Sequence, residues 1–119
     1  MNSKLRGSWG EACAAAFLRK QGYKPVAMGY RTRFGEIDII AETKEYIAFV
    51  EVKLRKNADF AEAKEFVTKS KQEKIRTCAE IWLSQHETDL QPRFDVIEIY
   101  APLGEKTKNP EITHIIDAF

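Results

Sequence analysis

The order of helical and extended patterns in this sequence predicts an α/β fold, in which a mixed β-sheet of about five strands is flanked by two main helices in the order αβββαββ. Three observations support this prediction. Two β-rich runs are joined by a short polar turn between residues 34 and 54, a stretch at about residues 61–85 lacks Pro and Gly and carries a helical apolar stripe, and a further β-rich run follows Pro92.

The first helix is predicted at about residues 8–21. Ser8 and Glu11 have the spacing of a capping box, and apolar side chains then recur at helical spacing until Gly22, a typical C-terminal stop. Residues 23–30 are predicted to form a short strand, which Gly29 weakens.

The central hairpin is predicted from residues 34–41 and 46–54, which are joined by the polar segment 42–45. The second helix follows at about residues 61–85, and its buried stripe runs back from Trp82 to Val67. The remaining strands are predicted at residues 93–100 and 112–116, on either side of a polar loop at 104–110.

Composition predicts one domain over residues 1–119, because a chain of this length with 44% hydrophobic residues buries a core without a disulfide or a metal. The sequence has neither an apolar run of membrane-spanning length nor the apolar stretch of a signal peptide, so we expect a cytoplasmic protein without membrane contact. Six side chains are interpreted as structural, either because they lack metal-ligand spacing or because they lie on core stripes: Cys13, Cys78, His86, His114, Trp9 and Trp82.

Charge is distributed unevenly along the chain, although the net charge is only +1. Residues 1–34 carry seven basic side chains and one acid, and residues 53–76 carry eight basic side chains and four acids. Residues 35–52 carry five acids and one lysine, and residues 77–119 carry eight acids and three basic side chains. This pattern is compatible with a polyanion-binding rim around an acidic pocket and also with ordinary solvated faces.

Two acidic side chains are predicted to meet on the hairpin. Side chains alternate along a strand, so Glu36 and Asp38 share one face with Ile40, and Glu51 and Lys53 share one face of the next strand. If paired residue numbers add to 89, Asp38 lies opposite Glu51, whereas a sum of 87 places Glu36 there. Either register brings two carboxylates together.

Paired carboxylates beside an apolar face favour a hard divalent cation between them. Asp38, Glu51 and the carbonyl group of Val52 are candidate ligands of Mg²⁺ or Mn²⁺. Lys53 is a candidate to orient or deprotonate the attacking water during phosphodiester hydrolysis. The alternative is a metal-free salt bridge from Lys53 to Asp38 or Glu36.

The sequences GEIDIIA at residues 35–41 and FVEVKLR at residues 49–55 resemble the YraN family of uncharacterised bacterial proteins, which belongs with the restriction-endonuclease-like nucleases and is similar to the archaeal Holliday-junction resolvases. The resemblance covers nearly the whole chain. It implies a metal-dependent nuclease fold in which Asp38, Glu51 and Lys53 form the active site and Glu11 is an outlying acid. One departure lies at Gly29, where the family tends to have Asn.

Basic side chains near the hairpin are candidates for binding a nucleic-acid backbone, with plain solubility as the alternative interpretation. These are Arg31, Arg33, Arg55 and Lys56. Lys71 on the second helix is a further candidate, because it falls on an otherwise buried stripe. Glu11 has two compatible interpretations, as a helix-capping side chain and as a catalytic acid.

These patterns predict a Mg²⁺- or Mn²⁺-dependent nuclease acting on DNA, with branched or single-stranded substrates preferred because no base-reading motif is present. RNA is the alternative substrate. A binding module of the same fold without turnover, and a metal-free interaction protein, are the competing classes. The resolvase relatives act as homodimers, so the resemblance implies a dimer.

Overall fold

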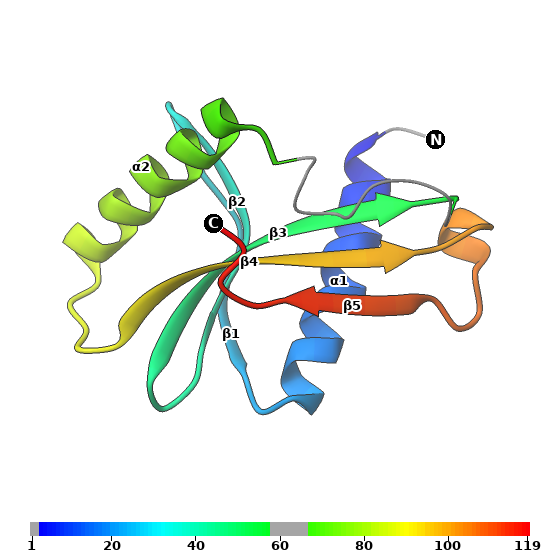
Figure 1. Cartoon of the computed structure of the whole chain (residues 1–119), viewed down its shortest axis with the longest axis horizontal. Helices are drawn as coiled ribbons and strands as arrows, with labels where there is room; N and C mark the ends of the chain where they lie inside the picture. Colours follow the sequence, from blue (N-terminus) through cyan, green and yellow to red (C-terminus); the bar gives the residue numbers. More distant parts are fainter. Residues whose placement is uncertain (1–2, 58–66) are drawn as a thin grey trace.

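Five strands form one mixed sheet in the order β1-β2-β3-β4-β5, with a helix on each face (Figure 1). This computed structural model describes residues 3–57 and 67–119, with side chains described from Trp9 onward. The elements are α1 (Ser3–Lys20), β1 (Lys24–Thr32), β2 (Gly35–Glu42), β3 (Tyr46–Arg55), α2 (Lys69–Gln85), β4 (Gln91–Tyr100), the 3₁₀ turn η2 (Gly104–Lys106) and β5 (Glu111–Ile115). The predicted α/β class and the order αβββαββ are confirmed.

The topology follows from one crossover. Strands β1, β2 and β3 are antiparallel neighbours, and β5 is antiparallel to β4. Strands β3 and β4 are parallel, so the chain between them returns to the other end of the sheet, and α2 lies within this connection. The central strand of the sheet is therefore β3, and α2 lies in the connection from β3 to its parallel neighbour β4.

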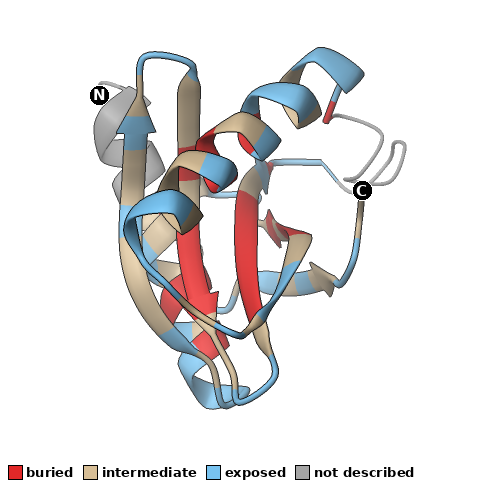
Figure 2. Ribbon diagram, turned by 90° about the vertical axis from the view of Figure 1, so that its left-hand side faces the viewer, coloured by how far each residue is buried: buried red, intermediate tan, exposed pale blue. Residues whose placement is uncertain are grey.

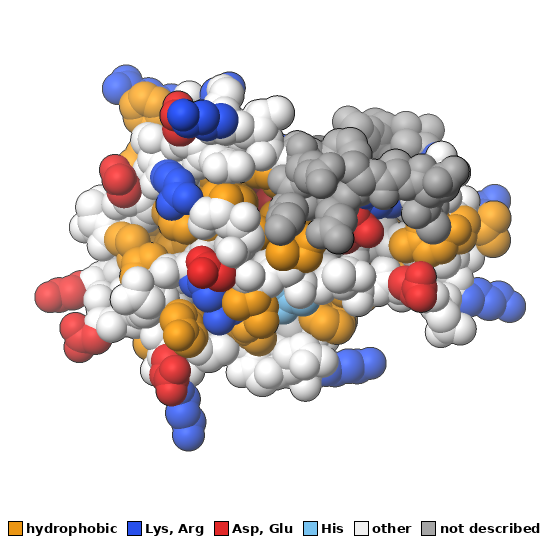
Figure 3. All heavy atoms as spheres, viewed as in Figure 1, with side chains coloured by type: hydrophobic (Ala, Val, Ile, Leu, Met, Phe, Trp, Pro, Cys, Tyr) orange, Lys and Arg blue, Asp and Glu red, His pale blue; other side chains and the backbone are white. Residues whose placement is uncertain are grey.

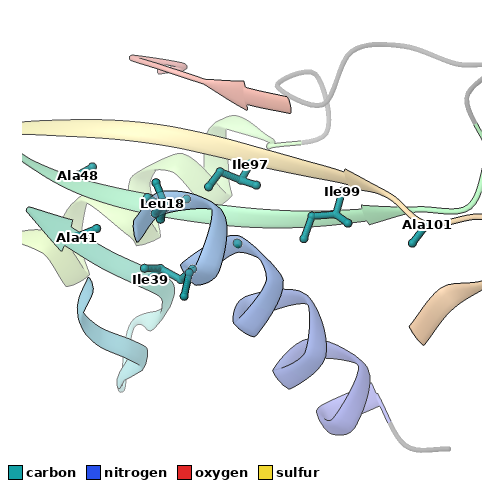
Figure 4. Close-up of a cluster of buried hydrophobic side chains, with 10 residues drawn as sticks. Leu18, Ile39, Ala41, Ala48, Ile97, Ile99 and Ala101 are labelled. Atoms are coloured by element: carbon teal, nitrogen blue, oxygen red, sulfur yellow. The ribbon is translucent and has the colours of Figure 1, made fainter. Parts of the chain in front are cut away.

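Each face of the sheet packs against one helix. Leu18 of α1 lies among side chains of the central strands, including Ile39 and Ile97 (Figure 4). On the other face, Ile75 of α2 packs in a cluster with Phe49 of β3. Buried residues therefore gather on the central strands and on the helix sides that face them (Figure 2).

Helix α1 ends where the sequence predicts and begins earlier. Gly22 has a φ of 93° and its N–H bonds to the carbonyl group of Arg19, while the N–H of Tyr23 bonds to Leu18, which is a Schellman motif. The predicted start at Ser8 is wrong, because the helix begins at Ser3. Ser8 lies inside the helix and is not its N-cap, so Glu11 has no capping role.

The hairpin of β2 and β3 has the register in which paired residue numbers add to 89. Ile39 pairs with Val50 and Ile40 pairs with Phe49. The alternation of faces is confirmed for these residues, since Ile39 and Val50 pack on the α1 side and Ile40 and Phe49 on the α2 side. Ile37 was predicted to share the face of Ile39, but it packs on the α2 side.

The β1–β2 pair extends beyond the β2–β3 ladder and turns towards α2, which explains the position of Ile37. Its partner Tyr30 makes an edge-to-face contact with Trp82 of α2, with ring centroids 5.1 Å apart. Gly29 lies between the pairs Met28–Ile39 and Tyr30–Ile37, and it has a φ of 65°. Gly and Asn adopt this left-handed conformation most readily. A glycine at this position therefore meets the backbone requirement of the strand at little conformational cost.

Helix α2 begins at Lys69 rather than near residue 61. Thr68 caps it, since the Thr68 hydroxyl accepts a hydrogen bond from the N–H of Lys71 at 3.2 Å. Residues 61–66 of the predicted helix lie outside the described residues. The predicted buried stripe is confirmed at Ile75, Cys78 and Ala79.

Both cysteines are free thiols; Cys78 is buried as predicted, and Cys13 is half-buried. In the part of the chain that the structure describes, no helix is both long enough and apolar enough to cross a bilayer.

Candidate functional site

The candidate site lies where β2 and β3 separate. The backbone ladder between them ends at the pair of Ile39 and Val50, one position before Asp38 and Glu51. Beyond this point the Asp38 carboxylate accepts a hydrogen bond from the N–H of Val52 at 2.8 Å. The Asp38 side chain thus takes the place of a backbone acceptor and is fixed at the fork of the sheet.

Glu51 is a nearly buried carboxylate that two lysines approach. Its side chain is only 6% exposed, and its Oε1 lies 2.8 Å from Nζ of Lys71 and 3.8 Å from Nζ of Lys53. Lys53 follows Glu51 on the same face of β3, whereas Lys71 comes from the first turn of α2. The parallel crossover therefore brings a cation from the second half of the chain onto a carboxylate of the first half.

Two further carboxyl groups, from Glu11 and Glu36, converge on Asp38. Oxygen atoms of Glu11, Glu36 and Asp38 all lie within 4.8 Å of one another. Glu11 reaches the group from α1, as the resemblance implied. Glu36 also pairs with exposed Arg31 at 3.1 Å. The sequence places Glu36 opposite Glu51 only in the alternative register, but its position two residues before Asp38 on the same strand indicates that it shares the site.

Burial and the closely spaced carboxylates of the site raise the pKa values of Asp38 and Glu11. Burial, with repulsion from Glu51 next, raises the pKa of Asp38 from 3.8 to about 7. Burial, together with the charges of Glu36 and Glu51, also raises the pKa of Glu11. The two lysines do not fully compensate for the carboxylates at this fork.

The pKa values of the two lysines beside Glu51 shift in opposite directions. Burial, and next the nearby Lys71 charge, lowers the pKa of Lys53. Burial is the largest single influence on Lys71 and acts to lower its pKa, but the hydrogen bond to Glu51 and the negative charges of Glu51 and Asp38 together outweigh burial, so the pKa rises. Lys71 is therefore a stable cation, and Lys53 loses its proton more readily than an ordinary lysine does.

A cavity of about 280 Å³ opens onto these groups. Its sheet side carries the carboxylates of Glu36, Asp38 and Glu51. Its α2 side carries the polar residues Thr68, Ser70, Lys71 and Lys74. One wall is therefore acidic, and the other offers hydroxyl and ammonium groups.

The donor set fits a hard divalent cation. All candidate ligands offer oxygen atoms, which Mg²⁺ and Mn²⁺ prefer, and the raised pKa of Asp38 marks the uncompensated charge that such an ion neutralises. Asp38 and Glu51 are the predicted ligands that the register brings together. Glu36 and Glu11 supply additional carboxylates. The Val52 carbonyl stays a prediction, whereas the Val52 N–H is engaged by Asp38.

The predicted basic group is only partly exposed. Arg31 and Lys56 are exposed, and Arg33 lies in the β1–β2 turn with its guanidinium 4.7 Å from the centroid of the Phe34 ring.

Arg55 was predicted to contact nucleic acid, but its side chain is 8% exposed and forms an ion pair with Glu98 of β4. The prediction for Arg55 is wrong because the adjacent strand supplies a buried counter-charge. On the face shown in Figure 3, outside the grey atoms, basic and acidic side chains are intermingled.

A second polar network lies apart from the cavity. Asp95 of β4 is fully buried and accepts two hydrogen bonds from Arg93, at 2.9 and 2.7 Å. His114 Nε2 lies 2.7 Å from the same carboxylate, and the N–H of Asp117 donates to it at 3.0 Å. Arg93 also donates to the Tyr23 hydroxyl. The sequence predicts a structural His114 but not this network, because its members are far apart in the chain.

Comparison with known proteins shows which family this chain belongs to. A family model described as an uncharacterised protein family, UPF0102, matches residues 10–99. The chain belongs to the UPF0102 family. This membership is consistent with the resemblance to the YraN family, and the matched residues contain all four carboxylates of the site.

Relatives in the UPF0102 family cover the full chain. A UPF0102 protein of Caldanaerobacter subterraneus subsp. tengcongensis is 42% identical over 120 residues, which are 100% of this chain and 98% of the relative. One of Acetivibrio thermocellus is 42% identical over 121 residues, covering 99% and 93%. One of Clostridioides difficile is 42% identical over 120 residues, covering all of both chains. Family membership alone assigns no activity, so function has to be argued from the site.

Proposed function

We propose that this protein is a nuclease that hydrolyses phosphodiester bonds of DNA with the help of Mg²⁺ or Mn²⁺. The observation that supports the proposal is the meeting of Asp38, Glu51 and Lys53 at the fork of the sheet, beside a cavity with a basic opposite wall. Oxygen ligands for a hard cation, a lysine next to them and cations for a phosphate group are the components that phosphodiester hydrolysis requires.

Each residue has a role in this proposal. Asp38 and Glu51 would hold the cation, with Glu36 and Glu11 as additional acids. The bound cation would supply positive charge opposite the phosphate group as negative charge builds up on it. Lys53, whose pKa burial lowers, would orient the attacking water and accept its proton at Nζ.

The proposed substrate is DNA with branched or single-stranded character. Arg31, Arg33 and Lys56 would contact the phosphate backbone, which positions a substrate without reading its bases. Two copies of the protein would present two sites to a branched junction, so the proposal includes a homodimer, which light scattering of the protein in solution tests. RNA is the alternative substrate.

Cleavage of a labelled panel tests this function. The panel contains duplex, single strand, flap, four-way junction and RNA, each incubated with Mg²⁺ or Mn²⁺. We expect the wild type to cleave, and Asp38→Asn and Glu51→Gln to lose cleavage while keeping the native circular dichroism spectrum. Glu80→Gln is the matched control, because Glu80 is an exposed carboxylate of α2 away from the cavity. Equal cleavage by the wild type and both site variants would overturn the proposal.

The competing function is a nucleic-acid-binding module without turnover. It is favoured by the ion pairs of Glu51 with Lys71 and Lys53, which balance one carboxylate without a cation. Binding of the same panel without cleavage in either metal would establish this module and exclude the nuclease.

A further inference from the structure

Lys71 occupies a position that a metal ion and a phosphate group would both affect. Its Nζ lies 2.8 Å from Oε1 of Glu51, closer than the 3.8 Å of Lys53. A divalent cation that binds Glu51 therefore meets a carboxylate whose Oε1 an ammonium group already contacts. Two cations at one carboxylate repel each other, so binding of one weakens the contact of the other.

The two partners differ in their freedom to move. Glu51 is 6% exposed on a central strand, whereas the Lys71 side chain is 42% exposed on the first turn of α2. Lysine has a flexible stem and a compact charge that can change partner without a fixed geometry. When the pair opens, Glu51 stays in place and the Lys71 ammonium moves.

The cavity offers space into which the Lys71 ammonium group can move when it leaves Glu51. Lys71 lines the cavity on the α2 side, opposite Asp38 and Glu51. Ser70 and Lys74 lie on the same side of the cavity. A phosphate group that approaches a cation on the carboxylates would enter this space and meet the ammonium that the cation has released.

We propose that Lys71 is an exchangeable counter-ion, which holds Glu51 in the metal-free protein and transfers to a substrate phosphate when a divalent cation binds Glu51. Lys71 thereby couples metal binding to phosphate binding as a positioning residue. This inference rests on the proposed function for the presence of a cation and a phosphate, but it concerns binding and not turnover.

Calorimetric titration of the protein with Mn²⁺, in the absence of nucleic acid, tests the exchange. Because Lys71→Met removes the competing charge, we expect it to bind Mn²⁺ at least about fivefold more tightly than the wild type. Lys71→Arg keeps the competitor and should bind as the wild type does. The matched control is Lys74→Met, which removes the same charge one turn later on the same cavity wall. Its affinity should change less than about twofold, as for a screened surface charge.

The titration also separates this inference from the proposed function. If Lys71→Met binds Mn²⁺ no more tightly than the wild type or Lys74→Met, the counter-ion role is overturned, whether or not the wild type cleaves DNA. If the metal affinities behave as expected and no substrate is cleaved, the exchange stands and the nuclease is overturned. Absence of Mn²⁺ binding in every variant at millimolar concentration overturns both.

A measurement on the wild type covers the case in which Lys71→Met does not fold. The NMR signal of the Lys71 side-chain nitrogen, assigned with the Lys71→Arg variant, should shift on titration with Mg²⁺, because the ammonium leaves the Glu51 carboxylate. A duplex oligonucleotide added at saturating Mg²⁺ should shift it again. A signal that does not move with Mg²⁺, while the Glu51 backbone amide does, would contradict the exchange.

Discussion

Asp38 is the residue at which folding and the proposed function conflict. Its carboxylate is held by the N–H of Val52, while burial and Glu51 raise its pKa to about 7. An unfolded aspartate ionises near pH 3.8, so the folded state retains a proton that the unfolded state has already lost. Without metal, ionised Asp38 therefore destabilises the fold, and this effect grows as the pH rises from about 4 to about 7.

Asp38→Asn should therefore stabilise the metal-free protein in a pH-dependent way. Asn keeps an acceptor for the Val52 N–H but carries no charge. We expect the melting temperature of the variant to be close to that of the wild type at pH 4 and above it at pH 8, measured with a chelator present. Asp89→Asn, at an exposed position, is the control and should show no such pH dependence. An equal gain at both pH values would contradict the raised pKa.

At the scale of one element, β1 depends on the backbone at Gly29. This residue has a φ of 65° within the strand, and a Cβ atom there would lie 3.8 Å from a carboxylate oxygen of Glu36. There is space for a side chain, so the limitation is conformational and not steric. The residue lies beside the acidic group, and its conformation helps to place the β1–β2 pair.

Two substitutions at Gly29 distinguish conformation from packing. Gly29→Ala should destabilise the protein by about 1 kcal/mol, because alanine is strained at a left-handed φ. Gly29→Asn should cost less, since asparagine tolerates this conformation. Urea denaturation of both variants and the wild type measures the difference. If the larger asparagine were the more harmful of the two, space and not backbone conformation would limit this position.

At the scale of the whole molecule, the Asp95 network joins distant parts of the chain. It connects β4 to His114 on β5, to the backbone of Asp117, and through Arg93 to Tyr23. Burial acts to raise the pKa of Asp95, but the hydrogen bonds from His114 and Arg93 outweigh it and the pKa falls below its usual value. The network contributes stability above about pH 4, which is lost as the pH falls through the lowered pKa.

Asp95→Asn should be strongly destabilising. The variant leaves the nearly buried Arg93 side chain without its counter-charge, which typically costs about 3 kcal/mol or more. Urea denaturation at pH 7 measures this loss, and Asp89→Asn provides the exposed control. A loss below about 1 kcal/mol would place Asp95 with surface ion pairs, which contribute little. The cavity is lined by other residues, so metal affinity should change little in this variant.

The sequence allowed the fold and the centre of the site to be predicted because both depend on local periodicity. Alternation along neighbouring strands allows two hairpin registers, and the structure has the one that pairs Ile39 with Val50. The early start of α1 was missed because Ser8 and Glu11 imitate a capping box inside a continuing helix. The burial of Arg55 against Glu98 depends on strand pairing across the crossover, which no local pattern encodes.

The parallel pairing of β3 with β4 also affects the order in which the protein folds. Tyr46 pairs with Gln91, whereas β1, β2 and β3 pair with their neighbours in sequence. Contacts between distant residues form slowly, because the loop between them must first lose its freedom. Asp38 and Glu51 can therefore meet before α2 delivers Lys71. During this interval the nascent protein carries unbalanced negative charge, so dissolved cations should speed its folding even before they have a finished site to bind.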